Sequence, residues 1–256
     1  MRILSVMVLL CTALLSGCSS KMGGGEPLRV GVMADYPPII FKNEDGSLNG
    51  LEAEFARGLG DALSRPVEFY QYSLAGLFAA LDSGEIDIVM SGISVTEERQ
   101  RHYLFSLPYT TIGQMAMIRQ DDAPRISTPG ALFHSQFRVG YKNGTTGEAM
   151  VMDRVDGVSK GFDSNEAAMQ ALMDGDIDVF VHDAPTVWNL ANHRDYPVKL
   201  LGLYTPLTRE QLAWVMRKDN RSLKSDVDAV LKEWMNSGEL IRLKHKWMPV
   251  KILAGE

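Results

Sequence analysis

One pattern occurs twice in the chain and constrains its fold more than any other feature. "GEIDIVMSGIS" at 84–94 returns as "GDIDVFVHDAP" at 175–185, an offset of 91 positions (175 − 84). In the same order, "LRVGVMADYPP" at 28–38 returns as "FRVGYKNGTTG" at 137–147, an offset of 109 (137 − 28). Each copy contains a short buried strand bounded by turn residues. The doubling predicts two similar lobes of unequal length; a chance match of two common strand-helix units is the alternative.

Strand and helix patterns alternate within the first copy. Apolar residues recur every four positions in the interval 50–63, at Leu51, Phe55, Leu59 and Leu63. This spacing places them on one face of a helix. Strand patterns lie at 28–32, 67–71 and 87–90, and a second helix pattern covers 74–84. A β-α-β-α-β series favours a mostly parallel sheet flanked by helices, so we predict an α/β fold.

Two extended segments predict a hinge between the lobes. "FSLPYTTIGQMAMI" at 105–118 leaves the first lobe, and "TREQLAWVMRK" at 208–218 returns to it. Two helices, at 225–238 and 239–247, then close the chain. We therefore predict a first lobe from 27–112 plus 211–256 and a second lobe from 113–210, joined by two crossings.

The N-terminus carries an export pattern. Arg2 precedes an uncharged run, Ile3–Gly17, which is too short to span a membrane and is typical of a secretory signal peptide. "LLSGC" resembles a bacterial lipobox, which implies cleavage before Cys18, a lipid on its thiol and attachment to the outer face of a membrane. We predict a signal peptide at 1–17 and a lipidated linker at 18–26. In the alternative, Cys18 is a plain linker residue.

Charge and cysteine content exclude several classes of function. The chain has 26 Lys and Arg against 32 Asp and Glu, a net charge of −6, which disfavours nucleic acid and anionic lipid as partners. Its two cysteines, Cys11 and Cys18, fall in the signal and at the lipid site, so the mature lobes have no thiol for a disulfide, a metal or a nucleophile. The five histidines show no close metal spacing, and we predict neither metal nor cofactor.

Ligands of open parallel sheets gather at the carboxyl ends of the strands. In the first lobe this end is "SGISVTEER", where Ser94 and Thr96 offer hydroxyls and Thr96 begins a short helix that carries Arg99. A guanidinium presents a planar fork of donors that suits a carboxylate. In the alternative, Arg99 is an ordinary solvated helical arginine.

The second lobe ends its repeated strand with Asp183. This carboxylate could neutralise an ammonium, or it could cap the helix that starts near Pro185, and the two roles are compatible. The loop "NGTTG" precedes another helix, where free amides could hold an anion, although an ordinary turn explains the loop equally well. A cation on one lobe and an anion on the other suit a small zwitterion, and an amino acid is the simplest one.

At these residues the chain resembles the bacterial extracellular solute-binding proteins of family 3, which feed amino acids to ABC transporters. The resemblance covers 27 to about 248 and rests on "ADYPPIIF", "DIVMSGISVTEERQRHYLFSLPY", "RVGYKNGTTGE", "DIDVFVHDAP" and "SGELIRLKHKW". It implies a type II periplasmic binding fold, a periplasmic or extracytoplasmic location, monomeric state, and ABC transporter membrane subunits as partners.

The resemblance also implies a role for each site residue. Arg99 would grip the ligand carboxylate with the backbone amides of Ser94 and Thr146. Asp183, the carbonyl of Gly92 and the hydroxyl of Ser94 would receive the ammonium. The remaining predicted ligand contacts are Tyr36 as an aromatic wall, Lys142 at a position that varies with the ligand, and Thr145, Met33 and Leu74.

Three of these positions bear on specificity. Leu74 stands where many members carry a second aromatic wall, and Met33 where binders of basic amino acids commonly carry aspartate. With Lys142 nearby, an apolar Met33 argues against lysine or arginine as the ligand, unless Asp35 points inward and reverses the local charge. Ordinary core packing is the alternative for Met33 and Tyr36.

Other functions on the same scaffold remain alternatives. The family resemblance includes periplasmic cyclohexadienyl dehydratases, whose chemistry needs a general acid near the leaving hydroxyl. Glu148, Asp35 and His182 are candidates, but their spacing does not require catalysis, and His182 also suits a packed structural role. We predict no enzyme. A ligand-binding component of a sensory system would have the same lobes.

Overall fold

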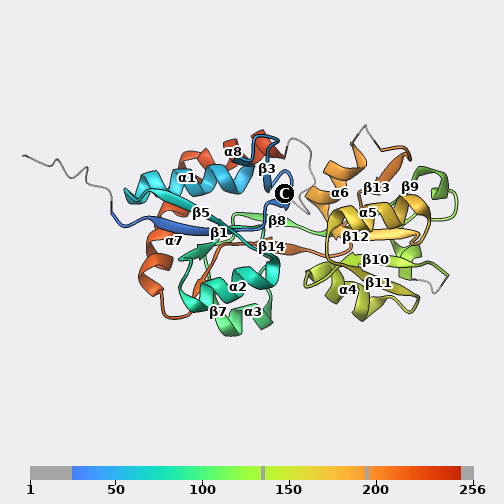
Figure 1. Cartoon of the computed structure of the whole chain (residues 1–256), viewed down its shortest axis with the longest axis horizontal. Helices are drawn as coiled ribbons and strands as arrows, with labels where there is room; N and C mark the ends of the chain where they lie inside the picture. Colours follow the sequence, from blue (N-terminus) through green and yellow to red (C-terminus); the bar gives the residue numbers. More distant parts are fainter. Residues whose placement is uncertain (1–24, 134–135, 194–195, 249–256) are drawn as a thin grey trace, which may run out of the picture.

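The computed structural model describes residues 25–133, 136–193 and 196–248. The predicted signal peptide and Cys18 lie outside the described residues, and of the predicted linker only Gly25 and Glu26 lie within them. Two lobes, each built around a five-stranded sheet, lie side by side along the long axis of the molecule (Figure 1).

The first lobe has the sheet order β5-β1-β6-β15-β7. Its strands are β1 (Leu28–Val32), β5 (Val67–Gln71), β6 (Ile88–Val89), β7 (Tyr103–Phe105) and β15 (Val215–Arg217). Its helices are α1 (Leu51–Leu63), α2 (Leu74–Ser83), α3 (Glu97–His102), α7 (Arg221–Ser237) and α8 (Glu239–Trp247). The strands β5, β1 and β6 are parallel, whereas β15 runs antiparallel to both of its neighbours. Helices α1 and α2 cover opposite faces of the sheet (Figure 1).

The second lobe has the order β11-β10-β12-β9-β13. Its strands are β9 (Gln114–Arg119), β10 (Val139–Lys142), β11 (Ser159–Phe162), β12 (Val179–Asp183) and β13 (Leu200–Leu203). Its helices are α4 (Thr146–Arg154), α5 (Asn165–Asp174) and α6 (Ala184–Ala191), with short 3₁₀ turns η1 (Gln120–Asp122) and η2 (Pro129–Phe133). Here too the first three strands are parallel, and β9 runs antiparallel to both of its neighbours, β12 and β13.

The predicted repeat is confirmed by the strand order. In each lobe the first strand pairs with the second on one side and with the third on the other, β5-β1-β6 and β11-β10-β12. The prediction of mostly parallel sheets holds for these three strands. The reversed strand of each sheet, β9 or β15, is the one that directly follows a crossing strand, β8 or β14, so the chain enters the sheet there from the side of the hinge.

Two antiparallel strands, β8 (Thr110–Ile112) and β14 (Glu210–Leu212), lie between the lobes and form the two predicted crossings (Figure 1). A small sheet of β2 (Asp35–Tyr36), β3 (Ile40–Lys42) and β4 (Leu48–Asn49) also belongs to the first lobe. The domain boundaries at 112/113 and 210/211 stay predictions, and both fall at this strand pair.

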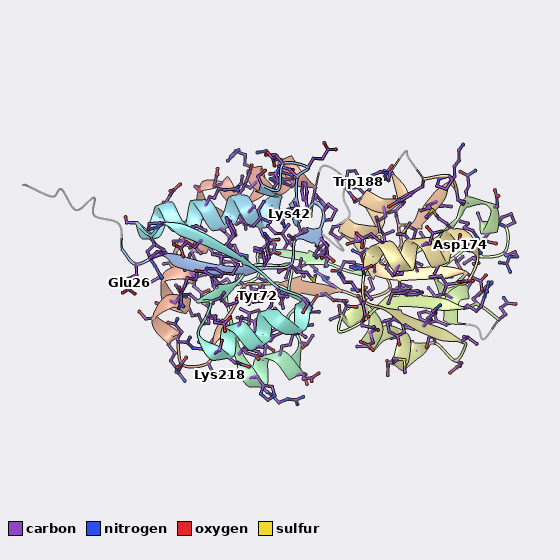
Figure 2. All side chains as sticks on the ribbon, in the orientation of Figure 1. Glu26, Lys42, Tyr72, Asp174, Trp188 and Lys218 are labelled. Atoms are coloured by element: carbon purple, nitrogen blue, oxygen red, sulfur yellow. The ribbon has the colours of Figure 1, made fainter. Side chains whose placement is uncertain are left out.

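The lobes are in contact along their facing sides. One hydrophobic cluster contains Leu28 and Phe55 from the first lobe together with Phe162 and Leu172 from the second. The labelled Trp188, which packs against this cluster, lies on the side of the second lobe that faces the first (Figure 2). Hydrogen bonds from Tyr36 to Asp183 and from Asn165 to Asp35 also join the lobes, so the structure is a closed arrangement of two lobes about a hinge.

Candidate ligand-binding site

All ten predicted ligand residues line a single small cavity between the lobes. Its volume is about 40 Å³. The lining residues are Met33, Tyr36, Leu74, Ser91, Gly92, Ile93, Ser94, Arg99, Lys142, Thr145, Thr146, His182 and Asp183. The carboxyl ends of β6 and β12 thus meet across the cleft as the strand pattern predicted, although the binding role of each residue stays a prediction.

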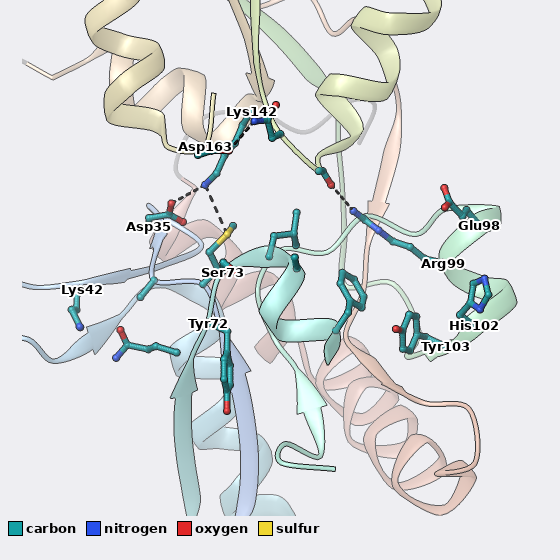
Figure 3. Close-up of a pocket in the computed structure, with 18 residues that line it drawn as sticks. Asp35, Lys42, Tyr72, Ser73, Glu98, Arg99, His102, Tyr103, Lys142 and Asp163 are labelled. Atoms are coloured by element: carbon teal, nitrogen blue, oxygen red, sulfur yellow. Dashed lines mark hydrogen bonds and ion pairs between the residues drawn. The ribbon is translucent and has the colours of Figure 1, made fainter. Parts of the chain in front are cut away.

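A larger cavity of about 1010 Å³ adjoins the small one and shares Met33, Leu74, Arg99 and Lys142 with it (Figure 3). Pockets for small molecules usually measure about 300–1,000 Å³, so 40 Å³ alone is too small for an amino acid. The small cavity can therefore hold only part of such a molecule, and the rest has room in the large cavity.

Arg99 projects from α3 into the cleft. Thr96 caps this helix, since its hydroxyl accepts the amide proton of Arg99 at 3.2 Å, as the sequence predicted. The guanidinium donates to the carbonyl of Ser94 at 3.0 Å and, across the lobes, to that of Gly144 at 3.3 Å (Figure 3). Burial lowers the pKa of Arg99, and the nearby carboxylates of Asp183 and Glu210 oppose that shift. Arg99 is therefore a half-buried cation facing the cavity, which excludes the alternative of an ordinary solvated arginine.

Asp183 is the last residue of β12 and is 7% exposed. One carboxylate oxygen accepts from the hydroxyl of Tyr36, in the other lobe, and the second accepts from the amide of Gln114. Its side chain makes no capping hydrogen bond to α6, so the capping alternative is wrong for the carboxylate. Burial raises the pKa of Asp183 against the opposing effect of these hydrogen bonds.

Lys142 is 4% exposed at the end of β10 and forms an ion pair with Asp35 across the cleft, with Nζ and Oδ2 2.7 Å apart (Figure 3). The sulfur of Met33 lies 3.8 Å from the same Nζ. Asp35 therefore does point inward, the condition that sequence could not decide. Because the ammonium of Lys142 is compensated, the argument from sequence against basic ligands no longer holds.

The "NGTTG" loop forms an ordinary helix start, and the backbone amide of Gly144 in it is already hydrogen-bonded within the lobe. The hydroxyl of Thr145 accepts from the amide of Glu148 at 3.3 Å and donates to the carbonyl of Lys142 at 2.7 Å. The carboxylate of Glu148 in turn accepts from the amide of Gly144 at 2.7 Å. This reciprocal cap removes Gly144 from the donors that an anion could use. Donation by Thr146 stays a prediction.

His182 is packed rather than poised for chemistry. Its Nδ1 accepts from the amide of Asp183 at 2.7 Å, and its ring contacts Phe180 and Tyr36. Burial, followed by the nearby charge of Lys142, lowers the pKa of His182 to about 3, so the imidazole is neutral at physiological pH. The structural interpretation of His182 is therefore the one that its contacts support.

Sequence reasoning missed two residues that hydrogen-bond to side chains lining the small cavity. Gln114, at the start of β9, is 0% exposed and donates to both Asp183 and Thr146. Glu210 on β14 accepts hydrogen bonds from Ser94 and Thr146. The available signal for Gln114 was a lone amide in the apolar run "IGQMAMI". Glu210 had no such signal, because it lies in the polar segment "TREQ".

Within the described ranges, three or more His, Cys, Asp or Glu side chains never gather as they would around a metal ion. In the same part of the chain, every helix is too short or too polar to cross a membrane.

Three comparisons extend these observations. The model of the bacterial extracellular solute-binding proteins, family 3, matches residues 28–250. The L-cystine-binding protein TcyJ of Escherichia coli (strain K12) is 29% identical over 95% of this chain and 94% of its own length. The crystal structure of an ancestral amino acid-binding protein, AncCDT-1, described as a precursor of cyclohexadienyl dehydratase, has a TM-score of 0.78 and 32% identity, covering 86% of this chain and 94% of its own. The structure of an ancestral arginine-binding protein bound to glutamine has a TM-score of 0.79 and 29% identity, covering 87% of this chain and 97% of its own.

Proposed function

The chain belongs to the bacterial extracellular solute-binding proteins, family 3, and on that premise we propose that it captures an amino acid outside the cytoplasm and delivers it to an ABC importer. One observation carries the proposal: a guanidinium from the first lobe, Arg99, and a carboxylate from the second, Asp183, line the same cavity. An amino acid carries the complementary pair of charges on one carbon atom, so it can engage both lobes at once.

Binding then works by hinge closure. Each lobe holds only half of the charge complement, so a zwitterion interacts better with the closed arrangement than with an open one. That difference in affinity shifts the population toward closure. The strand pair β8 and β14 is the element about which the lobes turn.

The side chain of the ligand extends into the larger cavity. There it meets Met33, Leu74 and the compensated pair Lys142–Asp35. A side chain of single charge would leave one member of that pair without its partner, which is costly for a buried lysine. We therefore propose a ligand whose side chain is neutral or carries balanced charges.

The first test is a thermal-melting scan of the chain from Ser19 onward, unfolded and refolded to remove carried ligand. The panel contains the twenty amino acids, cystine, prephenate and arogenate. A ligand at one hundred times its dissociation constant should stabilise the protein by about 2.7 kcal/mol, a shift of a few degrees. If no compound on the panel shifts the melting temperature, the proposed function is wrong.

Arg99→Ala should weaken the ligand identified in this way by about 2 to 5 kcal/mol, because the bound carboxylate loses its cation in a buried site. Arg101→Ala is the matched control, since Arg101 lies on the same helix but is exposed. Equal affinity of the two variants for the ligand would contradict a binding role for Arg99.

We propose that the chain has no enzymatic activity. Each candidate acid is already engaged: Glu148 in a helix cap, Asp35 with Lys142, and His182 as a neutral, packed ring. None of them offers a free proton to a leaving hydroxyl. Conversion of prephenate or arogenate by the purified protein would overturn this.

We further propose that the mature protein is a monomer held at the outer face of a membrane by lipid on Cys18. The whole chain has an acidic net charge of −6, so the lobes have no attraction to anionic lipid and the anchor would act alone. Cys18→Ser should release the protein into the soluble extracytoplasmic fraction, and retention in the membrane fraction would contradict the anchor.

A further inference from the structure

Glu210 joins the two lobes from within the hinge. Its Oε2 accepts from the hydroxyl of Ser94 at 2.7 Å and from that of Thr146 at 2.6 Å, and its Oε1 accepts from the hydroxyl of Thr208 at 2.6 Å. Ser94 belongs to the first lobe and Thr146 to the second. One carboxylate on a crossing strand therefore bonds to a predicted ligand residue of each lobe.

These bonds decide what the hydroxyl of Ser94 can offer a ligand. A serine hydroxyl has one proton and two lone pairs. With its proton on Glu210, Ser94 faces the cavity only as an acceptor, which is the form that an ammonium requires. A hydroxyl with a free proton could instead turn it toward the ligand carboxylate or the solvent.

The network continues to the other predicted partner of the ammonium. Thr146 donates to Glu210 and accepts from the amide of Gln114 at 3.1 Å, and Gln114 also donates to Asp183. A continuous chain of hydrogen bonds thus runs from Ser94 through the hinge to Asp183. Every bond in it has a defined donor, so its members are fixed in orientation as a set.

We propose that Glu210 is a positioning residue for ammonium capture: it orients the hydroxyl of Ser94 as an acceptor and ties that orientation to closure of the lobes. The inference rests on the proposed capture of an amino acid and adds a residue to it. Glu210 also lies close enough to Arg99 for its charge to act on the guanidinium, so its negative charge belongs to the electrostatics of the site.

The test is a double-mutant cycle on the amino acid that wild type binds, with dissociation constants from calorimetry. Glu210→Ala should weaken binding about tenfold in the wild-type background and less than about threefold in Ser94→Ala, because the orientation that it supplies is already lost there. Equal factors in the two backgrounds would overturn the proposal. If wild type itself binds no amino acid, the proposed function is wrong. If wild type binds one and the two factors are equal, only the role of Glu210 is wrong.

Two further variants separate positioning from folding. Glu210→Gln keeps an amide oxygen that can accept both protons, so it should retain more affinity than Glu210→Ala; equal losses would overturn the orientation argument. Gln211→Ala, exposed on the same strand, is the control and should bind as wild type does. Ligand-free melting temperatures of all variants show whether each is folded before its affinity is compared.

Discussion

Glu52 is a carboxyl group with no exposure to solvent, at the start of α1. It accepts from the amide of Gly92 at 2.8 Å and from the hydroxyl of Tyr109, which directly precedes the hinge strand β8. The side chain therefore holds both the loop whose carbonyl is predicted to receive the ligand ammonium and the entry to the hinge. Burial raises the pKa of Glu52 from 4.5 to about 7, although both hydrogen bonds act to lower it.

This shift predicts that stability falls as the pH rises. The folded pKa lies above the unfolded one, so the stabilising contribution of protonated Glu52 is complete below about pH 4.5 and is lost as pH rises through 7. The Glu52→Gln side chain cannot ionise, so the melting temperature of this variant should rise relative to that of wild type as the pH increases from 5 to 8. The full difference is on the order of 3 kcal/mol. Glu54→Gln, on the same helix, is the control; a constant gap between Glu52→Gln and wild type across this range would contradict the assignment.

The pair Lys142–Asp35 makes a second prediction, about ligand choice. Asp35→Asn leaves the buried ammonium of Lys142 without its carboxylate, so amino acids with acidic side chains should gain affinity relative to neutral ones. Lys142→Met frees Asp35 and should favour basic side chains instead. The melting scan repeated on both variants checks this reciprocity, and an unchanged ligand order in both would show that the pair does not face the side chain.

At the scale of elements, both lobes contain the same β-α-β-α-β unit, and the two copies differ in the residues that follow the last strand. The amide and guanidinium of Arg29 bond to Asp87 at 3.0 and 2.6 Å, and those of Arg138 bond to Asp178 at 2.9 and 2.9 Å. These residues correspond at the offsets of 109 and 91 positions. At the second offset, Gly92 corresponds to Asp183, so the equivalent strand ends supply a carbonyl and a carboxylate.

Gly92 permits this strand end to turn as it does. Its φ is +64°, and an added Cβ would lie 2.4 Å from the Tyr36 ring. Gly92→Ala should displace Tyr36 and weaken ligand binding more than about tenfold, in addition to roughly 1 kcal/mol of backbone strain. Gly175→Ala is the control, because Gly175 has a φ of +81° and open space around it. Calorimetry on both variants should show loss of affinity only for Gly92→Ala.

At the scale of the whole molecule, polar bonds between the lobes hold the closed arrangement. Among the described residues they include the pair Lys142–Asp35 and the bonds Tyr36–Asp183, Arg99–Gly144 and Asn165–Asp35. Most involve groups that a ligand would also contact. On the proposed function, closure and binding involve the same residues, so a bound ligand favours closure only where its own contacts are stronger than the bonds that it replaces.

Removing one such bond should open the ligand-free protein. Tyr36→Phe leaves the buried carboxylate of Asp183 without one of its donors, at a cost of about 1–3 kcal/mol in the closed state. Small-angle scattering should then show a larger radius of gyration without ligand, and saturating ligand should reverse it. Tyr70→Phe removes a hydroxyl that bonds to Glu68 within the first lobe and should scatter as wild type does. No change in Tyr36→Phe would mean that this bond does not hold the lobes together.

The sequence by itself determined the repeated β-α-β-α-β unit, the two crossings, the short capped helix that carries Arg99 and the strand end that carries Asp183. These features depend on short-range rules, namely apolar periodicity, turn residues and caps, which operate within a few residues of one another. The order of the strands within each sheet, with the first strand between the second and the third, was not predicted, because it depends on which strands pair across the sheet.

Only the tertiary structure decided which groups meet across the cleft. The partners Lys142–Asp35, Tyr36–Asp183 and Ser94–Glu210 lie 107, 147 and 116 positions apart. Their contacts depend on the angle between two lobes, and no local pattern encodes that angle. The sequence did not predict a role for Glu210 for this reason. A glutamate in a polar segment has no local signal, and only the fold of the hinge places Glu210 between Ser94 and Thr146.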